Sequence, residues 1–353
     1  MQDRLSLLNT WLKQILRGVD EAQFKVEPVA GDASFRRYFR VITQSGKRYI
    51  AMDAPPEKED CKPFVSVTRA WSEPGIAVPK IYSEDIEQGF LLLEDFGDIQ
   101  LFDVVDQVDT KTQSDIYTTA LDELQKLQAL PLKELEHDSY DRALLARELA
   151  LFSDWLITKA LSIKLTSEQA NLLDASFELL IENALSQEHC VVHRDYHSRN
   201  LMVLDDKQIG VIDYQDAVIG PYTYDLVSLL RDCYIRLNSE LIKDLALGFK
   251  SGSANRNIRA LPEQVFLRHF DLMGVQRHMK AAGIFARLAL RDGKLGYLQD
   301  IPRTFSYITE VCSKYEELQA LATFLLKEIE PSIQGFIDSQ TLDKPERSQE
   351  AAK

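Results

Sequence analysis

The sequence predicts an α+β protein of two lobes, a small antiparallel sheet followed by a larger, mainly helical part. Short alternating segments rich in β-branched and aromatic residues occupy much of residues 24–97. Leucine-rich segments with helical spacing dominate from residue 101 onward. A chain of 353 residues is also too long for one small core. We therefore place the first lobe at residues 1–97, the second at 98–338, and a polar tail, expected to be frayed, at 339–353.

The composition excludes several classes of protein. A net charge of −14 without a basic stripe argues against a nucleic-acid partner. Uninterrupted apolar runs are only a few residues long, so no membrane span or secretory signal is expected. The four cysteines are scattered, which is typical of reduced thiols in a cytoplasmic protein. Nothing in the sequence indicates an obligate protein partner.

The first lobe combines five predicted strands with two predicted helices. The first helix is amphipathic, and we expect it to pack on its own lobe. The second ends at Glu73-Pro74-Gly75, a strong helix stop. The strands are predicted at residues 24–28, 35–41, 48–53, 78–82 and 89–97, and the helices at 1–18 and 62–72.

The second lobe shows repeated helical stripes of apolar residues, which are typical of core-facing helices. Before the central polar segment, leucine-rich stripes occupy residues 116–130, 144–161 and 172–185. After it, helix is favoured at residues 224–235, 238–249, 262–279, 283–292 and 301–326.

The most informative stretch is residues 191–214, which is predicted to form three short strands joined by a polar turn and a tight turn. Asp195, Asn200 and Asp213 lie where these strands end, so their side chains could converge on one point. Two carboxylates and an amide are oxygen ligands of the kind that suit Mg²⁺ with bound phosphates. The alternative is a solvated hairpin whose polar residues only form turns.

The spacing of this segment favours the chemical interpretation. His193-Arg194-Asp195 is followed by Asn200 at the kinase catalytic-loop distance, and Asp213 ends the next strand. Asp225 then follows Gly220-Pro221 closely. In the kinase pattern the first Asp accepts the proton of the attacking hydroxyl, and the Asn and later Asp hold the metal. The segment therefore predicts a phosphotransferase.

Two further segments are candidate nucleotide contacts. The turn at residues 30–34, with Ser34 at its end, could direct backbone N–H groups at phosphates. Arg36 and Arg37 follow it and could bind the same phosphates, although basic residues also occur on solvent-facing edge strands. The strand at 89–97 is interpreted as ending in the hinge between the lobes, with backbone groups of Glu94 and Phe96 facing an adenine.

These motifs make the chain similar to the aminoglycoside phosphotransferase-like kinases, a branch of the protein-kinase-like fold. The resemblance extends over about residues 24–325. It implies Asp195 as catalytic base, Asn200 and Asp213 as Mg²⁺ ligands, and ATP as co-substrate between the lobes. It further implies that His193 and Asp225 support the catalytic loop. The resemblance depends on Ser34-Phe35-Arg36-Arg37-Tyr38, Leu93-Glu94-Asp95, His193-Arg194-Asp195 with Asn200, Ile212-Asp213-Tyr214 and Asp225-Leu226.

One departure from this family stands out. Its members usually carry a Lys or Arg on the third strand, paired with a Glu in the next helix. The corresponding positions fall near Asp53 and Phe64, so both halves of the ion pair are missing together. A pseudokinase is the alternative explanation, but the predicted base and metal ligands are intact. Candidates for a replacement cation are Arg36, Arg37, Lys58 and Lys62.

This joint absence, together with several short motifs, narrows the resemblance. The chain resembles the bacterial kinases that phosphorylate the anomeric hydroxyl of N-acetylmuramate and N-acetylglucosamine in cell-wall recycling. Rival assignments are an aminoglycoside or small-alcohol (choline or homoserine) phosphotransferase, and a non-catalytic nucleotide-binding protein. The motifs are Met52-Asp53-Ala54-Pro55-Pro56, the segments 213–217 and 224–234, Gly220-Pro221, Gly274-Val275-Gln276-Arg277-His278 and Arg291-Asp292-Gly293-Lys294.

Sugar contacts are expected from the second lobe. Asp216, Arg231 and Asp232 are the substrate-binding candidates, because a sugar needs paired donors and acceptors and an Arg suits a lactyl carboxylate. Arg231 and Asp232 could instead form a local ion pair with each other. Arg277 and His278 are weaker candidates for the same role.

Overall fold

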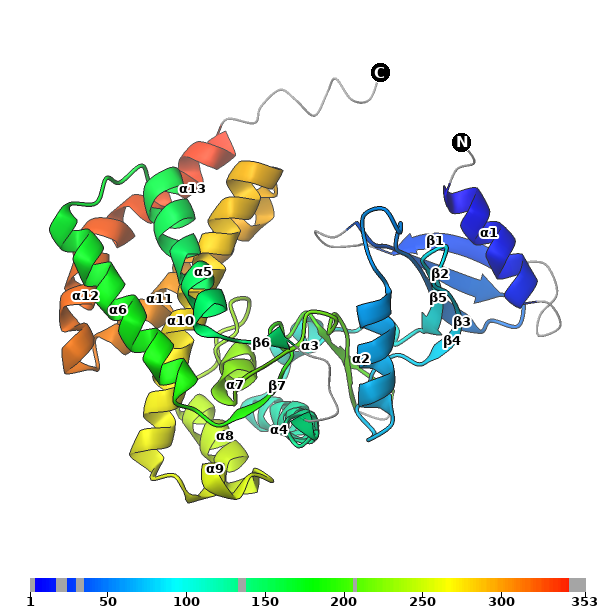
Figure 1. Cartoon of the computed structure of the whole chain (residues 1–353), viewed down its shortest axis with the longest axis horizontal. Coiled ribbons are helices and arrows are strands. Elements are labelled where there is room, and N and C mark those ends of the chain that lie inside the picture. The colour runs from blue at the N-terminus through cyan, green and yellow to red at the C-terminus, as the bar shows by residue number, and fades with distance from the viewer. Residues whose placement is uncertain (1–3, 17–23, 30–34, 133–137, 206–207, 343–353) are drawn as a thin grey trace. The chain divides into compact units, whose positions relative to one another are not determined.

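The computed structural model shows a chain of two compact units, a sheet unit and a helical unit (Figure 1). The first combines Met1–Val104 with Arg199–Asp216, and the second combines Val105–Ser198 with Ala217–Lys353. The predicted α+β arrangement, with an antiparallel sheet first and helices after it, is confirmed. The structure describes residues 4–16, 24–29, 35–132, 138–205 and 208–342.

The sheet of the first unit has five antiparallel strands in the order β1-β2-β3-β5-β4. All five predicted strands are present. The largest shift is in β4, which begins after Pro79, a residue that has no N–H to donate to a ladder. The strands are β1 (Phe24–Val29), β2 (Arg37–Thr43), β3 (Arg48–Asp53), β4 (Ile81–Asp85) and β5 (Phe90–Glu94).

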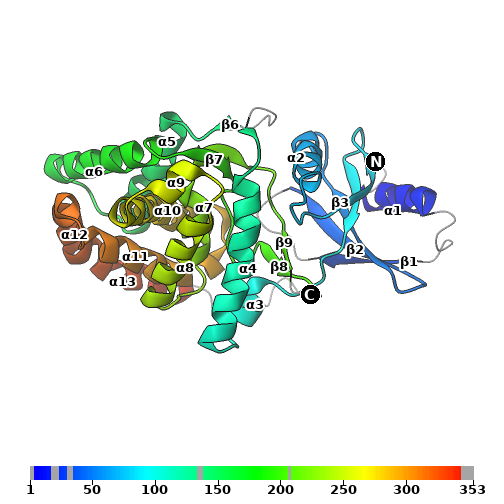
Figure 2. The ribbon, with the colours of Figure 1, turned by 90° about the horizontal axis from the view of Figure 1, so that it is seen from below.

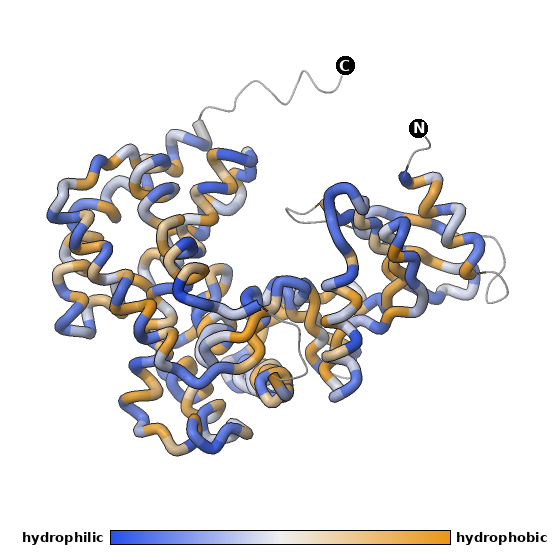
Figure 3. Tube along the Cα trace, viewed as in Figure 1, coloured by the Kyte–Doolittle hydropathy of each residue, from blue (hydrophilic) through white to orange (hydrophobic). Residues whose placement is uncertain are grey.

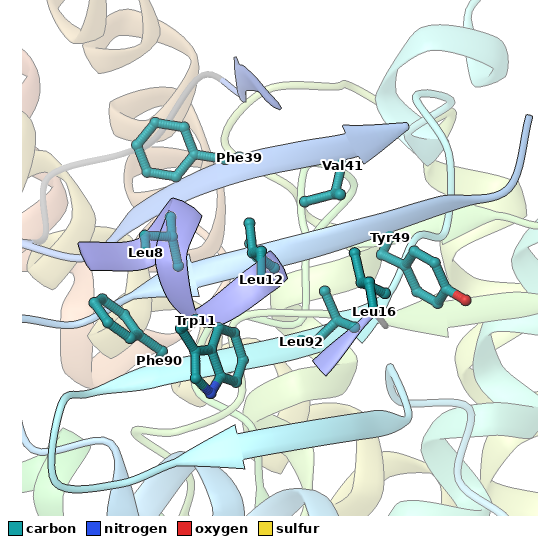
Figure 4. Packing of buried hydrophobic residues seen from close by; sticks show 10 residues of the cluster. Leu8, Trp11, Leu12, Leu16, Phe39, Val41, Tyr49, Phe90 and Leu92 are labelled. Atoms are coloured by element: carbon teal, nitrogen blue, oxygen red, sulfur yellow. The ribbon is translucent and has the colours of Figure 1, made fainter. Parts of the chain in front are cut away.

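Helix α1 (Arg4–Ile15) covers one face of this sheet (Figure 4). Leu8, Trp11 and Leu12 share one side of the helix, because positions three and four apart lie on the same face. The helix therefore packs on its own lobe, as its amphipathic pattern predicts. On the sheet its partners alternate along each strand, and they are Phe39, Val41, Tyr49, Ala51, Phe90 and Leu92.

Asp53 ends β3 and is fully buried between two arginines. Its carboxylate accepts hydrogen bonds from Arg4 of α1 and from Arg37 of β2. Arg4 also donates to the carbonyl oxygen of Gln88 at 2.8 Å and lies 4.8 Å from the centre of the Phe90 ring. A buried carboxylate without such partners would be costly, so these contacts fix α1 against the end of β3.

The hairpin of β8 (Leu201–Val203) and β9 (Ile209–Val211) clusters with the first unit. The N–H of Val203 donates to the carbonyl of Ile99 at 2.9 Å, and the N–H of Val211 donates to Ala77 at 2.7 Å. The sequence-based division, with its boundary after residue 97, assigned this hairpin to the second lobe. These hydrogen bonds between distant segments explain the difference. Helices α2 (Lys62–Ser72) and α3 (Leu101–Val105) accompany them.

The second unit is built around α10 (Glu263–Asp292), a helix of 30 residues that contacts α5, α6, α7 and α11 (Figure 2). Gly283 allows close approach, because a Cβ there would lie 2.4 Å from the carbonyl oxygen of Leu151. The other helices are α4 (Thr110–Gln128), α5 (Arg142–Leu151), α6 (Ser167–Leu185), α7 (Thr223–Leu230), α8 (Ser239–Gly252), α9 (Arg256–Ala260), α11 (Ile301–Cys312), α12 (Gln319–Phe324) and α13 (Glu330–Leu342).

Shorter elements complete this unit. A small sheet has the order β6-β10-β7, in which β10 pairs in parallel with β6 and antiparallel with β7. Apolar residues, drawn in orange in Figure 3, recur along the surrounding helices. The strands are β6 (Asp138–Ser139), β7 (His189–Val192) and β10 (Val218–Pro221), and short π-helical and 3₁₀ segments cover Phe152–Ala160, Leu325–Ile329, Leu295–Asp300 and Glu316–Leu318.

The end of the chain is partly helical. Helix α13 continues to Leu342, so residues 339–342 of the tail that was expected to be frayed belong to a helix, and residues 343–353 lie outside the described part. Within the residues that the structure describes, none of the helices combines the length and apolar character needed to cross a membrane.

The buried charges at Asp53 lead to a stability prediction. Asp53→Ala is expected to lower the free energy of unfolding by about 3 kcal/mol, because two arginines lose their shared counter-charge. Arg37→Ala should cost only about 0.5 kcal/mol, because its side chain is 45% exposed and water screens its charge. Urea unfolding followed by circular dichroism measures both. Equal losses would contradict this account of the cluster.

Candidate active site

The face of the sheet opposite α1 borders a cavity of about 430 Å³, whose lining belongs entirely to the first unit. Tyr38 and Arg40 of β2 and Ile50 of β3 line it, because these side chains alternate with those that face α1. Phe64 of α2 lines it as well, and so do residues 93–98 at the end of β5.

Asn200 and Asp213 flank the β8–β9 hairpin, and both line this cavity. Asn200 precedes β8 and Asp213 follows β9, and the N–H of Ile212 donates to the carbonyl oxygen of Asn200 at 3.1 Å. Asp213 has a φ of 64°, a left-handed conformation that costs energy in a residue other than glycine. Strain of this kind is common where a side chain is held for function.

The donor atoms of these two residues fit a divalent cation. A carboxylate and an amide oxygen are ligands that Mg²⁺ accepts, and both side chains face one cavity. The described residues contain no group of three His, Cys, Asp or Glu side chains suited to a metal. A cation here would therefore depend on the Asn200 amide and on oxygens of a bound phosphate, as Mg²⁺ usually does.

The tripeptide Asp95-Phe96-Gly97 follows β5 at the cavity. The Asp95 carboxylate accepts hydrogen bonds from Arg40 at 2.7 Å and from the N–H of Gly97 at 2.9 Å, and it pairs with Arg48 at 3.1 Å. The Phe96 ring lies against Gly210 of β9, where a Cβ would be only 2.6 Å from it. Arginines thus surround Asp95, and Glu94 and Phe96 both line the cavity.

The two neighbouring arginines of the nucleotide prediction lie on opposite faces of the sheet. Arg36 lines the cavity, with a guanidinium nitrogen 3.3 Å from a carboxylate oxygen of Glu59. Arg37 faces α1 and pairs with Asp53, so it does not line the cavity. Ser34 lies outside the described residues.

Arg36 and Asp213 act on the same neighbour within this cavity. Burial is the main cause that raises the pKa of Tyr38 to about 12; the Asp213 carboxylate contributes to this rise, and the Arg36 charge opposes it. Both charges are therefore close enough to the Tyr38 hydroxyl to influence its ionisation. Sequence reasoning did not select Tyr38, since only the sheet register shows which tyrosine faces the cavity.

Asp53, the position assigned to the missing strand cation, does not face the cavity. Asp53 belongs to the α1 face of β3, whereas Ile50, three residues earlier, lines the cavity. Phe64 lines the cavity and stacks on Tyr214, with ring centres 5.1 Å apart. Among the described lining residues, the basic ones are Arg36, Arg40 and Arg199. Lys58 lies over the Phe35 ring instead, and Lys62 is exposed at the start of α2.

Asp195 lies in the second unit, on a loop whose backbone is held by two buried carboxylates. Asp225 of α7 accepts hydrogen bonds from the N–H groups of His193 at 2.6 Å and Arg194 at 3.0 Å. Asp232 accepts from the N–H of Ser198 at 2.9 Å. Asp225 and Asp232 therefore both hold the backbone of the loop that carries Asp195.

The surroundings of this loop shift the pKa values of Asp195 and Asp225 in opposite directions. Burial would raise the pKa of Asp195, but the nearby positive charges, led by that of Lys280, lower it below its usual value. Burial raises the pKa of Asp225 to about 7, in spite of its two backbone hydrogen bonds. Asp195 thus stays ionised at neutral pH, as a group that accepts a proton must.

The three residues predicted to bind substrate have different surroundings. Arg231 pairs with Asp271 and lies 4.6 Å from the centre of the Phe270 ring. The Asp232 carboxylate is occupied by backbone N–H groups, and in the described part of the chain Arg231 and Asp232 form no ion pair with each other. Asp216 belongs to the first unit and does not line its cavity. Arg231 and Asp232 therefore have different partners within the second unit, and a role in substrate binding stays a prediction for all three residues.

A cluster of buried charges was missed by sequence reasoning. Glu148 of α5 pairs with Arg194 at 2.7 Å and with Lys280 of α10 at 3.2 Å. Lys280 also donates to the hydroxyl of Tyr224 at 2.8 Å. No local pattern could reveal this cluster, because its members come from elements far apart in the sequence.

The fold and this set of residues define a phosphotransferase of the protein-kinase-like fold. Residues 25–261 match the phosphotransferase enzyme family, and the chain belongs to that family.

The names of individual relatives are more specific than the description of the family. The chain is 38% identical to an N-acetylmuramate/N-acetylglucosamine kinase of Pseudomonas putida, over 91% of this chain and 96% of the relative. Proteins of the same name from Pseudomonas aeruginosa (39% identical, 91% of this chain and 96% of the relative) and Neisseria meningitidis (37%, 93% and 96%) are also similar.

Solved structures show the same fold at low sequence identity. An ethanolamine kinase of Plasmodium vivax superposes with a TM-score of 0.62 at 11% identity, over 90% of this chain and 89% of that one. An ADP-bound aminoglycoside phosphotransferase superposes with a TM-score of 0.58 at 13% identity, over 87% of this chain and 98% of that one. Both confirm the predicted fold class.

The pKa of Asp225 gives a prediction about stability and pH. The folded chain holds this proton up to about pH 7, whereas the unfolded chain releases it near about pH 4. The contribution of Asp225 to the free energy of unfolding therefore falls as the pH rises through this window. An Asp225→Asn variant lacks this titration, so the stability gap between wild type and variant should narrow from about pH 5 to about pH 8. Denaturant titrations across this range test it, and a constant or widening gap would refute it.

Proposed function

We propose that this phosphotransferase moves the γ-phosphoryl group of ATP to the anomeric hydroxyl of N-acetylmuramate and N-acetylglucosamine, in cytoplasmic recycling of peptidoglycan. The sugar is inferred from the names of the three relatives, each at least 37% identical over more than 90% of this chain. The observation that supports kinase chemistry best is the meeting of Asn200 and Asp213 at one cavity, beside Arg36.

The cavity of the first unit is the proposed ATP site. Backbone groups of Glu94 and Phe96 leave the sheet ladder at the end of β5 and would face the adenine. Arg36 would bind the phosphates, because it is the cavity arginine that approaches Asp213 through their common neighbour Tyr38. Asn200 and Asp213 would hold Mg²⁺, which supplies charge neutralisation for the phosphates when bound. Ser34 remains a predicted contact only.

Asp195 is the proposed catalytic base. Its lowered pKa keeps it ionised, and the backbone hydrogen bonds of its loop to Asp225 and Asp232 fix its position. Phosphoryl transfer passes through a loose transition state, so orientation of the acceptor hydroxyl contributes more than strong basicity. An anomeric hydroxyl is more acidic than an ordinary alcohol and suits a weak base. Asp195 would orient this hydroxyl and accept its proton late in the reaction.

The activity and its base are tested together. ATP consumption should require Mg²⁺ and an N-acetylated amino sugar, and Asp195→Asn should lower kcat by about 10³-fold, within reach of general-base and positioning effects combined. The variant should bind ATP as wild type does, which calorimetry can verify. Turnover with aminoglycosides, choline or homoserine in place of the sugars would overturn the substrate assignment. Nucleotide binding without any turnover would indicate a non-catalytic protein.

The neighbouring arginines provide a matched pair for the phosphate contact. Arg36→Ala is expected to raise the KM for ATP by about 10-fold or more, the usual loss when a hydrogen bond to a charged group is removed. Arg37→Ala should leave this KM within about 2-fold of wild type, because the Arg37 side chain pairs with Asp53 on the other face of the sheet. Steady-state kinetics at saturating sugar distinguish them. A larger effect at Arg37 would show that the phosphates are held elsewhere.

A further inference from the structure

Helix α10 carries two buried cations in neighbouring turns, and their surroundings differ. Lys280 has a direct anionic partner, since its ammonium group lies 3.2 Å from a carboxylate oxygen of Glu148 and 2.8 Å from the Tyr224 hydroxyl. Arg277 lies one turn earlier and is only 5% exposed. Its charge has no comparable partner.

The guanidinium of Arg277 makes one polar contact within the described chain, from Nη1 to the Cys233 sulfur at 3.4 Å. Its Nε is enclosed and has no hydrogen-bond partner there. Among the described residues, no carboxylate oxygen lies within 4.0 Å of Arg277. A thiol is a weak acceptor, and the carboxylates of Asp232 and Asp195, which help to raise the pKa of Arg277, act from beyond ion-pair distance. A buried guanidinium without a direct anionic partner is costly. The neighbouring Arg303 donates to the carbonyl oxygen of the same Cys233 at 2.8 Å, but Arg303 is also paired with Asp300 at 3.1 Å.

The position of Arg277 links it to the base. Cys233 directly follows Asp232, whose carboxylate holds the N–H of Ser198 in the loop that carries Asp195. The positive charge of Arg277 is among those that lower the pKa of Asp195. Arg277 therefore lies near enough to Asp195 for its charge to act on the proposed base.

We propose that the guanidinium of Arg277 binds a carboxylate of the acceptor sugar, the lactyl carboxylate of N-acetylmuramate, and so sets the preference for that sugar. This rests on the proposed function, since it assumes an amino-sugar acceptor at Asp195. A guanidinium matches a carboxylate geometrically and remains charged when buried. N-acetylglucosamine has no lactyl group and would leave this charge unmatched. The transferred phosphoryl group is the other anion that could reach Arg277.

Kinetics with both sugars separate these anions. In an Arg277→Met variant, the ratio of kcat/KM for N-acetylmuramate to that for N-acetylglucosamine should fall by about 10- to 100-fold, the loss of one charge-assisted contact. The loss should appear mainly as a higher KM for N-acetylmuramate. Arg287→Met, on the same helix and half-buried, is the matched control and should leave the ratio unchanged.

The remaining outcomes are decisive as well. Equal losses with both sugars, whether from a folding defect or from a contact to the phosphoryl group, would overturn the proposal for Arg277. If Arg277→Met does not fold, Arg277→Lys keeps the charge without the planar fork, and it should lower the same ratio by a smaller factor. An unchanged ratio in that variant would also refute the proposal. Wild-type turnover of both sugars separates this result from failure of the proposed function, in which neither sugar is a substrate.

Discussion

Two buried carboxylates hold the loop that carries Asp195, the proposed catalytic base. Asp225 binds the backbone at His193 and Arg194, and Asp232 binds it at Ser198, so the segment around Asp195 is fixed at both ends. Both carboxylates are carried by α7 and its C-terminal end, which are buried in the helical core. The position of this loop therefore depends on the packing of the helices rather than on the sequence of the loop itself. Arg194 adopts a left-handed conformation between these anchors.

In the first unit, neighbouring charged side chains point to opposite faces of the sheet, so one set packs against α1 and the other lines the cavity. Arg37 and Asp53 face α1 and hold the helix on the sheet, while Arg36 and Arg40 face the cavity. Arg40 is engaged by Asp95 and Asp98, whereas Arg36, which pairs with Glu59 at 3.3 Å, is the cation that we propose for the phosphates. Arg36 directly precedes β2 and lines the cavity, so it brings positive charge to this face of the sheet. Phe64 and Tyr214 stack on each other at the same cavity, with ring centres 5.1 Å apart.

In the second unit, helix α10 supplies buried charged and polar side chains. It is buried along most of its length, yet it carries the polar residues Gln276, Arg277, His278 and Lys280 close together. Charges from this helix counter the burial of Asp195 and keep it ionised. In a chain with a net charge of −14, the buried Arg277 and Lys280 bring positive charge to the surroundings of Asp195.

The sequence determined what local spacing can encode. The five strands and the amphipathic first helix follow from patterns within short segments. The spacing along the sequence from Asp195 to Asn200 and Asp213 is a pattern of the same kind, and these patterns also carry the family resemblance. The side of a strand on which each arginine lies, the partners of Arg231 and Asp232, and the Glu148–Lys280 pair depended on the tertiary structure. These contacts join elements far apart in the chain, and a shift of one residue in register would exchange Arg36 with Arg37. Only the packed fold, in which buried charges must find partners, decides such contacts.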